Sequence, residues 1–270
     1  MEKHVVAVCQ INCGPDSWPA ENAEKLLSCL HRASADGARL VLFPELCLSG
    51  YPSATEDISE RLRATTSEQV ESIRACVQRL EVAAVVGLCE QADDNKVYNV
   101  SLAIAPDGSE TRYRKIHIPG NEGLFAPGDY GPAVADFGFV RLGISTCYDN
   151  WFGESARMAY LAGAEMLHMP FYWPAEWEVR DEIESKRTPM DNNSILKSRR
   201  ERMMKVFPAR AIDNGMYAVM VDQVAISDDL GKHLPGKSMV FDPYGELLAE
   251  TKGWKEETLY FEFVPERVQE

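Results

Sequence analysis

The chain is 270 residues long, and its 45% hydrophobic and 26% charged residues are enough for a globular protein with a sizeable core. Its formal net charge of −14 argues against a general affinity for nucleic acid or anionic membranes, because both would repel an acidic surface. Seven cysteines without paired spacing indicate reduced thiols in the cytoplasm and not a disulfide framework.

Short apolar runs alternate with helical patterns along the chain, which is typical of a layered α/β protein. In the first half, the pattern predicts strands at 5–11, 40–43, 83–89, 97–104 and 111–114 and helices at 20–35 and 67–80. In the second half, it predicts strands at 140–145, 166–169, 217–224 and 238–241 and helices at 154–162 and 196–213. No Pro-, Ser- or Gly-rich linker interrupts the pattern, so we expect residues 1–270 to form one domain.

Cys147 lies at a corner of this pattern, where the strand at 140–145 turns toward the helix at 154–162. A nucleophile suits such a corner, because the turn lifts the side chain out of the sheet and leaves backbone N–H groups free to hold an oxyanion. Buried cysteines are nevertheless most often small hydrophobic residues, so the position alone decides nothing.

Two charged residues occupy matching positions after segments that should be buried. Glu45 ends the apolar run that starts at Leu40, and Lys115 follows the strand at 111–114. Each could be an ordinary exposed side chain. Brought together with Cys147, they would supply the base, the electrostatic clamp and the nucleophile for acyl transfer.

Three sequence blocks that carry these residues resemble the signature blocks of the nitrilase superfamily, the carbon–nitrogen hydrolases, and they occur in the family's order. The blocks are 43–51, 113–119 and 143–149, and further likeness at 95–100, 209–214 and 236–245 extends the resemblance over nearly the whole chain. The resemblance implies an α/β fold, a four-layer α-β-β-α sandwich with two mixed sheets packed face to face. It also implies a homodimer, or a higher homo-oligomer, in which the helix at 154–162 packs against its twin.

The same resemblance implies a cysteine hydrolase that needs no cofactor. Glu45 would deprotonate Cys147, whose sulfur attacks the carbonyl carbon of a small amide or N-carbamoyl substrate, while Lys115 and the backbone N–H of Tyr148 hold the oxyanion. Water would then hydrolyse the thioester. The run Cys147-Tyr148-Asp149 favours amides over nitriles, because nitrilases proper tend to have Cys-Trp-Glu there. A nitrilase, an acyltransferase of the same fold and a catalytically silent binding subunit remain alternatives.

Several further residues are candidates for the site. Glu122, in the loop after the lysine, would position the substrate and hold Lys115, although a solvated loop carboxylate would look the same. Aromatic side chains would line the substrate pocket, although core packing would explain them equally well; they are Phe125, Trp151, Phe171, Tyr172 and Trp173, with Tyr148 beside the nucleophile.

Three segments leave questions open. The charged stretch 173–206 could be a lid, an oligomer contact, or a solvated loop leading into an amphipathic helix. Gly153 stands where relatives commonly have proline before the glutamate, and Asp222-Gln223 stands where they usually have asparagine. The usual contacts of the latter position are therefore in doubt.

Other chemistries find little support in the sequence. The chain begins directly with an apolar strand and shows no secretory leader, and no run approaches the ~20 apolar residues of a membrane span. Its five histidines are scattered, without zinc-binding spacing, and no glycine-rich phosphate or dinucleotide loop occurs. We therefore expect no metal, no nucleic-acid partner and no membrane partner.

Overall fold

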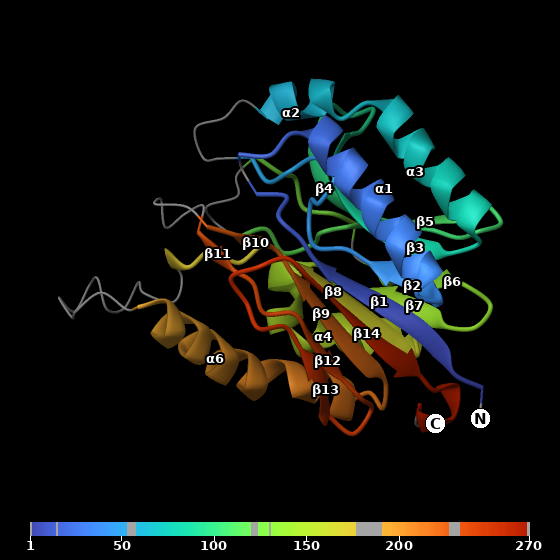
Figure 1. Cartoon of the computed structure of the whole chain (residues 1–270), viewed down its shortest axis with the longest axis vertical. Helices are drawn as coiled ribbons and strands as arrows, with labels where there is room; N and C mark the ends of the chain where they lie inside the picture. The colour runs from blue at the N-terminus through green and yellow to red at the C-terminus, as the bar shows by residue number, and fades with distance from the viewer. Residues whose placement is uncertain are drawn as a thin grey trace.

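The computed structural model describes residues 2–14, 16–52, 58–119, 124–129, 131–176, 191–226 and 233–268. Within these residues, two mixed six-stranded sheets form the centre of the molecule, and helices cover the outer faces of both (Figure 1). The expected α-β-β-α sandwich is confirmed.

The first sheet carries helices of the N-terminal half on its outer face. Its strand order is β14-β1-β2-β3-β4-β5. The strands are β1 (His4–Gln10), β2 (Ala38–Leu42), β3 (Ala83–Gln91), β4 (Val97–Ile104), β5 (Glu110–Arg114) and β14 (Glu257–Phe263). Strands β1, β2 and β3 are parallel, and the other neighbours are antiparallel. Its helices are α1 (Pro19–Ala35), α2 (Ile58–Ala64) and α3 (Ser67–Leu80).

The second sheet has the order β13-β12-β9-β8-β7-β6 and is parallel at its centre, through β7, β8 and β9. Its strands are β6 (Ala133–Asp136), β7 (Arg141–Ile144), β8 (Met166–Phe171), β9 (Tyr217–Asp222), β12 (Met239–Phe241) and β13 (Leu247–Glu250). Helices α4 (Gly153–Leu161) and α6 (Asn192–Ile212) pack on its outer face. Smaller elements are the ribbon of β10 (Val224–Ala225) and β11 (Leu234–Pro235) and the 3-10 helices η1 (Cys147–Trp151) and η2 (Pro265–Arg267).

Strand β1 shows why the central strands are apolar on both sides. Val6 and Val8 pack into the core between the two sheets, whereas Ala7 and Cys9 pack into the core beneath α1. A strand that is covered on both faces reads as a continuous apolar run and not as an alternating one. The buried runs of the sequence therefore mark the strands that meet at the centre of the sandwich.

The predicted elements are present, with shifted ends. The helix at 67–80 and the strand at 97–104 have the predicted bounds, whereas α6 begins at Asn192, four residues before the predicted start. The earlier start has a local cause, because Asp191 Oδ1 accepts hydrogen bonds from the N–H groups of Asn193 and Ser194, each at 2.9 Å. The predicted strand at 217–224 ends at Asp222, and the pattern missed α2, β6, β11, β13 and β14.

Among the described helices, none combines the length and the apolar character that crossing a membrane requires.

Candidate active site

Glu45, Lys115 and Cys147 each follow the end of a strand. Glu45 comes three residues after β2, Lys115 directly follows β5, and Cys147 comes three residues after β7. All three are buried, with relative exposures of 0%, 0% and 1%. The two sheets thus direct an acid, a cation and a thiol into the interior from three strand ends.

Hydrogen-bond donors surround the Glu45 carboxylate. Oε1 accepts from Lys115 Nζ at 2.8 Å and from Asn99 Nδ2 at 2.7 Å, and Oε2 accepts from the backbone N–H of Tyr172 at 2.8 Å. The Glu45 backbone carbonyl accepts from Gln223 Nε2 at 2.6 Å. Donors on β4, after β8 and after β9 therefore fix the position of Glu45, whose carboxylate is also paired with the Lys115 ammonium.

Cys147 has an unusual backbone conformation. Its φ angle is +51°, in the left-handed region that residues with a Cβ adopt uncommonly. Asn150 Nδ2 holds this turn by donating to the carbonyls of Ser145 at 2.6 Å and Cys147 at 3.2 Å. The strain at the thiol-bearing residue is thus maintained by side-chain bonds within the turn.

Tyr172 connects the thiol to the carboxylate. Cys147 Sγ donates to the Tyr172 carbonyl at 3.8 Å, and the N–H of the same residue binds Glu45 Oε2. One residue at the end of β8 therefore contacts both groups through its backbone, and this places the thiol and the carboxylate in one neighbourhood.

Asp149 ties the Cys147 turn to the segment that carries Lys115. Its fully buried carboxylate accepts from the His117 N–H and from His117 Nδ1, each at 2.7 Å, and from the Tyr113 hydroxyl at 2.7 Å. Burial, reinforced by the charge of Asp149, raises the pKa of Tyr113, so the hydroxyl remains a donor. Residues on both sides of Lys115 are therefore anchored to the turn of the nucleophile candidate.

A buried ion pair supports the segment after Tyr172. Arg199 on α6 lies 2.6 Å from Asp222 Oδ2 through Nη1, and its Nη2 donates to the Trp173 and Pro174 carbonyls. Both charged side chains are fully buried. Burial raises the pKa of Asp222 to about 7, although Arg199 acts in the opposite direction.

The sequence and the fold can now be compared with known proteins. The chain matches the family model described as carbon-nitrogen hydrolase over residues 5–270. The chain belongs to the carbon–nitrogen hydrolase family. It is 30% identical to a nitrilase of Pyrococcus abyssi, over 94% of this chain and 87% of that protein. It is 29% identical to an N-carbamoylputrescine amidase of Arabidopsis thaliana, over 96% of this chain and 86% of that protein.

The structural comparison agrees with the family assignment. A carbon-nitrogen hydrolase from Helicobacter pylori G27 superimposes with a TM-score of 0.82 at 26% identity, covering 99% of this chain and 91% of that one. The arrangement of two mixed sheets and their covering helices is therefore that of the family.

In this carbon–nitrogen hydrolase, the aromatic residues predicted to line the pocket divide between two clusters. Phe171 and Trp173, each 1% exposed, pack with Trp151 and Cys147 against α6. The rings of Trp151 and Trp173 meet edge to face with centroids 5.5 Å apart. The packing of these three residues fits a role in the hydrophobic core at least as well as a role in lining the substrate pocket.

The second cluster includes the Tyr172 side chain. Phe125 and Tyr172 pack there with Leu46 and Tyr51, and the rings of Tyr51 and Tyr172 stack with centroids 3.8 Å apart. Tyr148 is half-buried and meets Phe152 edge to face. Glu122 lies outside the described residues, as does 177–190 of the charged stretch at 173–206.

Sequence reasoning missed four polar residues that hold the site: Asn99, Asp149, Arg199 and Gln223. Asn99 had a signal, because it and Ser101 are the polar residues in the buried, mostly apolar run of β4. At Asp222-Gln223, Asp222 pairs with Arg199, and Gln223 Nε2 donates to the Glu45 backbone carbonyl. The periodicity gave no sign of which distant residues these side chains would meet.

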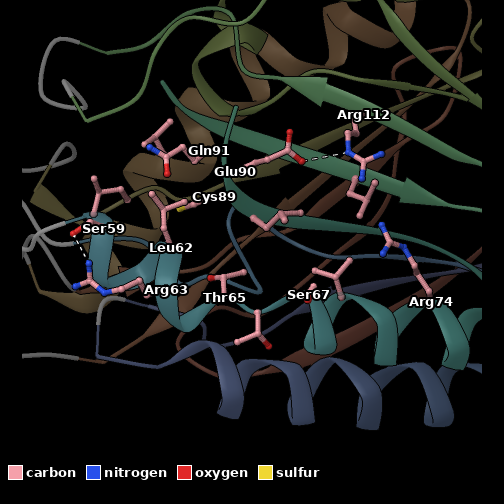
Figure 2. A pocket seen from close by; sticks show the side chains of 16 residues that line it. Ser59, Leu62, Arg63, Thr65, Ser67, Arg74, Cys89, Glu90, Gln91 and Arg112 are labelled. Carbon is pink, nitrogen blue, oxygen red and sulfur yellow. Dashed lines mark hydrogen bonds and ion pairs between the residues drawn. The ribbon is translucent and has the colours of Figure 1, made fainter. Parts of the chain in front are cut away.

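A separate cavity of about 640 Å³ lies between α2, α3 and the edge of β3 and β4 (Figure 2). Its charged groups already have partners: Arg112 lies 3.3 Å from Glu90, and Arg74 lies 2.5 Å from Glu110. None of Glu45, Lys115 and Cys147 lines it. We therefore place the candidate chemistry at the strand ends and not in this cavity.

Among the described residues, no group of three or more His, Cys, Asp or Glu side chains is arranged to hold a metal ion.

Proposed function

We propose that this carbon–nitrogen hydrolase cleaves a linear amide or N-carbamoyl C–N bond through a thioester on Cys147, with residues 1–270 acting as one catalytic domain. The observation that carries the proposal is the fully buried Glu45–Lys115 pair, 2.8 Å apart, next to the strained Cys147. The Tyr172 backbone joins the two, because its N–H donates to Glu45 and its carbonyl accepts from the Cys147 thiol. Burying two charges costs desolvation free energy, and the left-handed backbone of Cys147 costs conformational free energy. Such costs are typical of functional sites, which supports a catalytic role for these residues.

In the first half-reaction, Glu45 accepts the thiol proton and the Cys147 sulfur attacks the carbonyl carbon. Charge then develops on the substrate oxygen, and the Lys115 ammonium and the backbone N–H of Tyr148 stabilise it. As the C–N bond breaks, protonated Glu45 returns the proton to the leaving nitrogen, so that ammonia or an amine departs.

In the second half-reaction, the same groups hydrolyse the thioester. Glu45 removes a proton from water, the hydroxide oxygen attacks the thioester carbonyl, and the Cys147 thiolate leaves and regains its proton. Lys115, which lies 2.8 Å from Glu45, would stabilise the second oxyanion as it does the first.

We infer the substrate class from two supports. The run Cys147-Tyr148-Asp149 lacks the Cys-Trp-Glu pattern of nitrilases proper, and one relative at 29% identity is an N-carbamoylputrescine amidase. Nitriles are the second candidate class of substrate, because another relative, at 30% identity, is a nitrilase of Pyrococcus abyssi. Glu122 and the aromatic residues Phe125, Tyr148 and Tyr172 complete the proposed site around the substrate.

The proposal extends to setting and assembly. We place the enzyme in the cytoplasm, since all seven cysteines are free thiols in the described structure. We also propose a homodimer formed through α4, where Leu161 exposes 74% of its surface.

Ammonia release from a panel of substrates tests the proposed function. The panel holds aliphatic and aromatic amides, N-carbamoyl amines, N-carbamoyl amino acids and nitriles. We expect release from an amide or N-carbamoyl compound, and a loss of at least ~1,000-fold in Cys147→Ala. Cys76→Ala, which also removes a buried thiol, is the matched control and should retain activity. Release from nitriles alone would select the second class, whereas release that survives in Cys147→Ala would refute the assigned nucleophile.

A further inference from the structure

Helix α6 buries one charged side chain within an otherwise apolar stripe, on the side that packs against the second sheet (Figure 1). The buried residues of the helix follow one another at intervals of four; they are Ile195, Arg199, Met203, Phe207 and Ala211. An apolar side chain in place of Arg199 would continue the stripe without the free-energy cost of removing a guanidinium from water. The contacts of Arg199, whose relative exposure is 0%, therefore indicate what offsets that cost.

Arg199 joins the ends of two neighbouring strands of the second sheet. Its Nη1 donates to Asp222 Oδ2 at 2.6 Å, where β9 ends. Its Nη2 donates to the carbonyls of Trp173 and Pro174, just after the end of β8, the latter at 3.4 Å. Its Cζ lies 5.0 Å from the centroid of the Trp173 ring. A planar guanidinium can serve a carboxylate and backbone carbonyls at once through its fork of donors, which a lysine in the same place would not reproduce.

The segment that begins with Tyr172 depends on such contacts, because it lies beyond the paired part of the sheet. The ladder between β8 and β9 ends with the pair Phe171 and Asp222. Past this pair, the Tyr172 N–H donates to Glu45 Oε2 at 2.8 Å, and Arg199 binds the next two carbonyls. Side-chain contacts therefore take over from the ladder where the backbone reaches the candidate active site.

From Trp173, the contacts reach the thiol in two ways. The preceding residue, Tyr172, accepts from Cys147 Sγ at 3.8 Å through its carbonyl. The Trp173 ring meets the ring of Trp151 edge to face, with centroids 5.5 Å apart. Trp151 is the last residue of η1, and Cys147 is the first. A shift of Trp173 would therefore move both the acceptor of the thiol and the turn that carries the thiol.

From Asp222, the contacts reach the carboxylate. Asp222 Oδ1 accepts from the N–H of Gln223 at 3.0 Å, and the N–H of Asp222 donates to Ser238 Oγ at 3.0 Å. Gln223 Nε2 in turn donates to the Glu45 backbone carbonyl at 2.6 Å. The two members of the ion pair thus hold the neighbours of the thiol and of the carboxylate from one point on α6.

We propose that Arg199 and Asp222 are positioning residues for the hydrolysis. As one buried unit, they fix the Tyr172 backbone relative to Glu45 and Cys147, and so determine how fast the thiol is activated and acylated. This inference rests on the function proposed above for Glu45 and Cys147. It adds that the rate depends on an ion pair whose members act through their neighbours.

The expected effect follows from the geometry of the reaction. Proton transfer from the thiol and attack on the carbonyl carbon both require well-placed groups, and a misplacement of about 1 Å can cost on the order of 100-fold in rate. A positioning residue affects the transition state more than it affects binding of the ground state. We therefore expect kcat to fall when the ion pair is removed, while KM changes little.

The main variant combines Arg199→Met with Asp222→Asn, so that neither charge is left buried without its partner. The asparagine keeps an oxygen for the Gln223 N–H, whereas the methionine cannot donate to the two carbonyls. Arg199→Lys is the conservative variant, which keeps the cation beside Asp222 but not the fork of donors. Arg200→Met is the matched control, because this neighbouring arginine of α6 binds Glu250 on the edge strand β13, with Nε 2.8 Å from Oε2.

Two measurements are made on each folded variant. Steady-state kinetics on the best substrate of the panel give kcat and KM, and alkylation by iodoacetamide with peptide mass spectrometry gives the reactivity of Cys147 without a substrate. In the double variant, we expect kcat and the alkylation rate to fall at least ~10-fold and KM to change less than about threefold. Arg199→Lys should show an intermediate loss, and Arg200→Met should match the parent protein.

The outcomes separate this inference from the proposed function. An unchanged kcat and alkylation rate in the folded double variant would overturn the inference alone, as would an equal loss in Arg200→Met. If the double variant does not fold, an unchanged kcat and alkylation rate in Arg199→Lys would overturn it in the same way. A parent protein in which Cys147 reacts no faster than the buried Cys76 would instead refute the proposed function, and the inference with it.

Discussion

Glu45 and Lys115 are charged groups that water would solvate far better than the protein interior does. Their separation of 2.8 Å, together with the donors Asn99 and Tyr172, offsets part of that cost. Removing one partner would leave the other charge buried without compensation. A neutral isostere also removes the charge, but it keeps the shape of the site and an oxygen that can accept from Lys115, so it is a better probe of chemistry here than truncation.

Glu45→Gln tests the role of the base. The amide retains the size of the carboxylate but cannot accept the thiol proton, so we expect the thioester to form about 100- to 10,000-fold more slowly. Single-turnover measurement of acylation, with circular dichroism to check the fold, provides the result. An unchanged acylation rate in a folded variant would remove Glu45 as the base.

His168 on β8 is a buried histidine that the proposed chemistry does not use. Full burial lowers its pKa to about 3, whereas in the unfolded chain it titrates near 6.5. The unfolded state therefore binds a proton first as the pH falls. The stability that His168 contributes is complete above about pH 6.5 and is lost progressively as the pH falls toward 3.

His168→Gln should flatten the pH dependence of stability below pH 6.5, by at most ~1.4 kcal/mol per pH unit for a single proton. Urea unfolding at a series of pH values between 4 and 8 measures the slope. The exposed His31 provides the control variant, His31→Gln, which we expect to follow the parent protein. A slope that His168→Gln leaves unchanged would contradict the assignment.

At the scale of elements, the packing of β3 against the Glu45 turn determines where the carboxylate lies. A Cβ added at Gly87 would come within 2.3 Å of the Leu46 nitrogen and 3.0 Å of the Glu45 carbonyl carbon. The strand approaches that backbone as closely as only glycine permits. The turn cannot yield locally, because Leu46 already has a φ angle of +49°.

Gly87→Ala should therefore displace the Glu45 turn. We expect kcat to fall by at least ~10-fold and the unfolding free energy to fall by about 1–3 kcal/mol. Gly131→Ala is the control, because its added Cβ meets nothing within 4 Å. Equal activity and stability in the two variants would mean that the turn relaxes freely.

The sequence predicted elements well where local signals were strong. The helix at 67–80 begins where Thr66 and Gln69 form a reciprocal capping box, and the apolar periodicity continues to its end. Strands β13 and β14 were missed because one side of each faces solvent and their charged residues hide the pattern. Helix α2 was missed because seven residues give too few repeats for a period.

The candidate site also contains residues that the sequence could predict and residues that it could not. Glu45, Lys115 and Cys147 could be selected from the sequence, because each follows a strand and carries a reactive or charged group, and Glu45 and Cys147 follow apolar strands. The side chains that hold them could not, since Gln223 meets Glu45 across 178 residues and Asp149 meets His117 across 32. Such pairings follow from the order of strands in the two sheets, which periodicity does not specify.

At the scale of the whole molecule, the outer face of the second sheet carries exposed apolar side chains on its helices. Leu161 in α4 is 74% exposed and Ile212 at the end of α6 is 54% exposed. Burying these side chains against a second copy would remove apolar surface from water. This supports the proposed dimer through α4.

The dimer predicts a solution mass of twice the 30.2 kDa chain at micromolar concentration. Leu161→Glu should shift the mass toward that of the monomer, because a charge would be buried against its own copy. Ile226→Glu, at a position that is 75% exposed, is the matched control and should remain dimeric. Light scattering after size-exclusion chromatography measures the three masses, and a monomeric mass for the parent protein would rule the dimer out.

The most direct test of the whole account is to quench the enzyme with acid during turnover and locate the acyl group by mass spectrometry. We predict an adduct of the substrate's acyl mass on the peptide that contains Cys147, labile to hydroxylamine as a thioester is. It should accumulate when hydrolysis is slower than acylation and be absent in Cys147→Ala. An acyl group found on another residue during turnover would contradict the account. So would turnover that gives no adduct under any quench condition and proceeds at the same rate in Cys147→Ala.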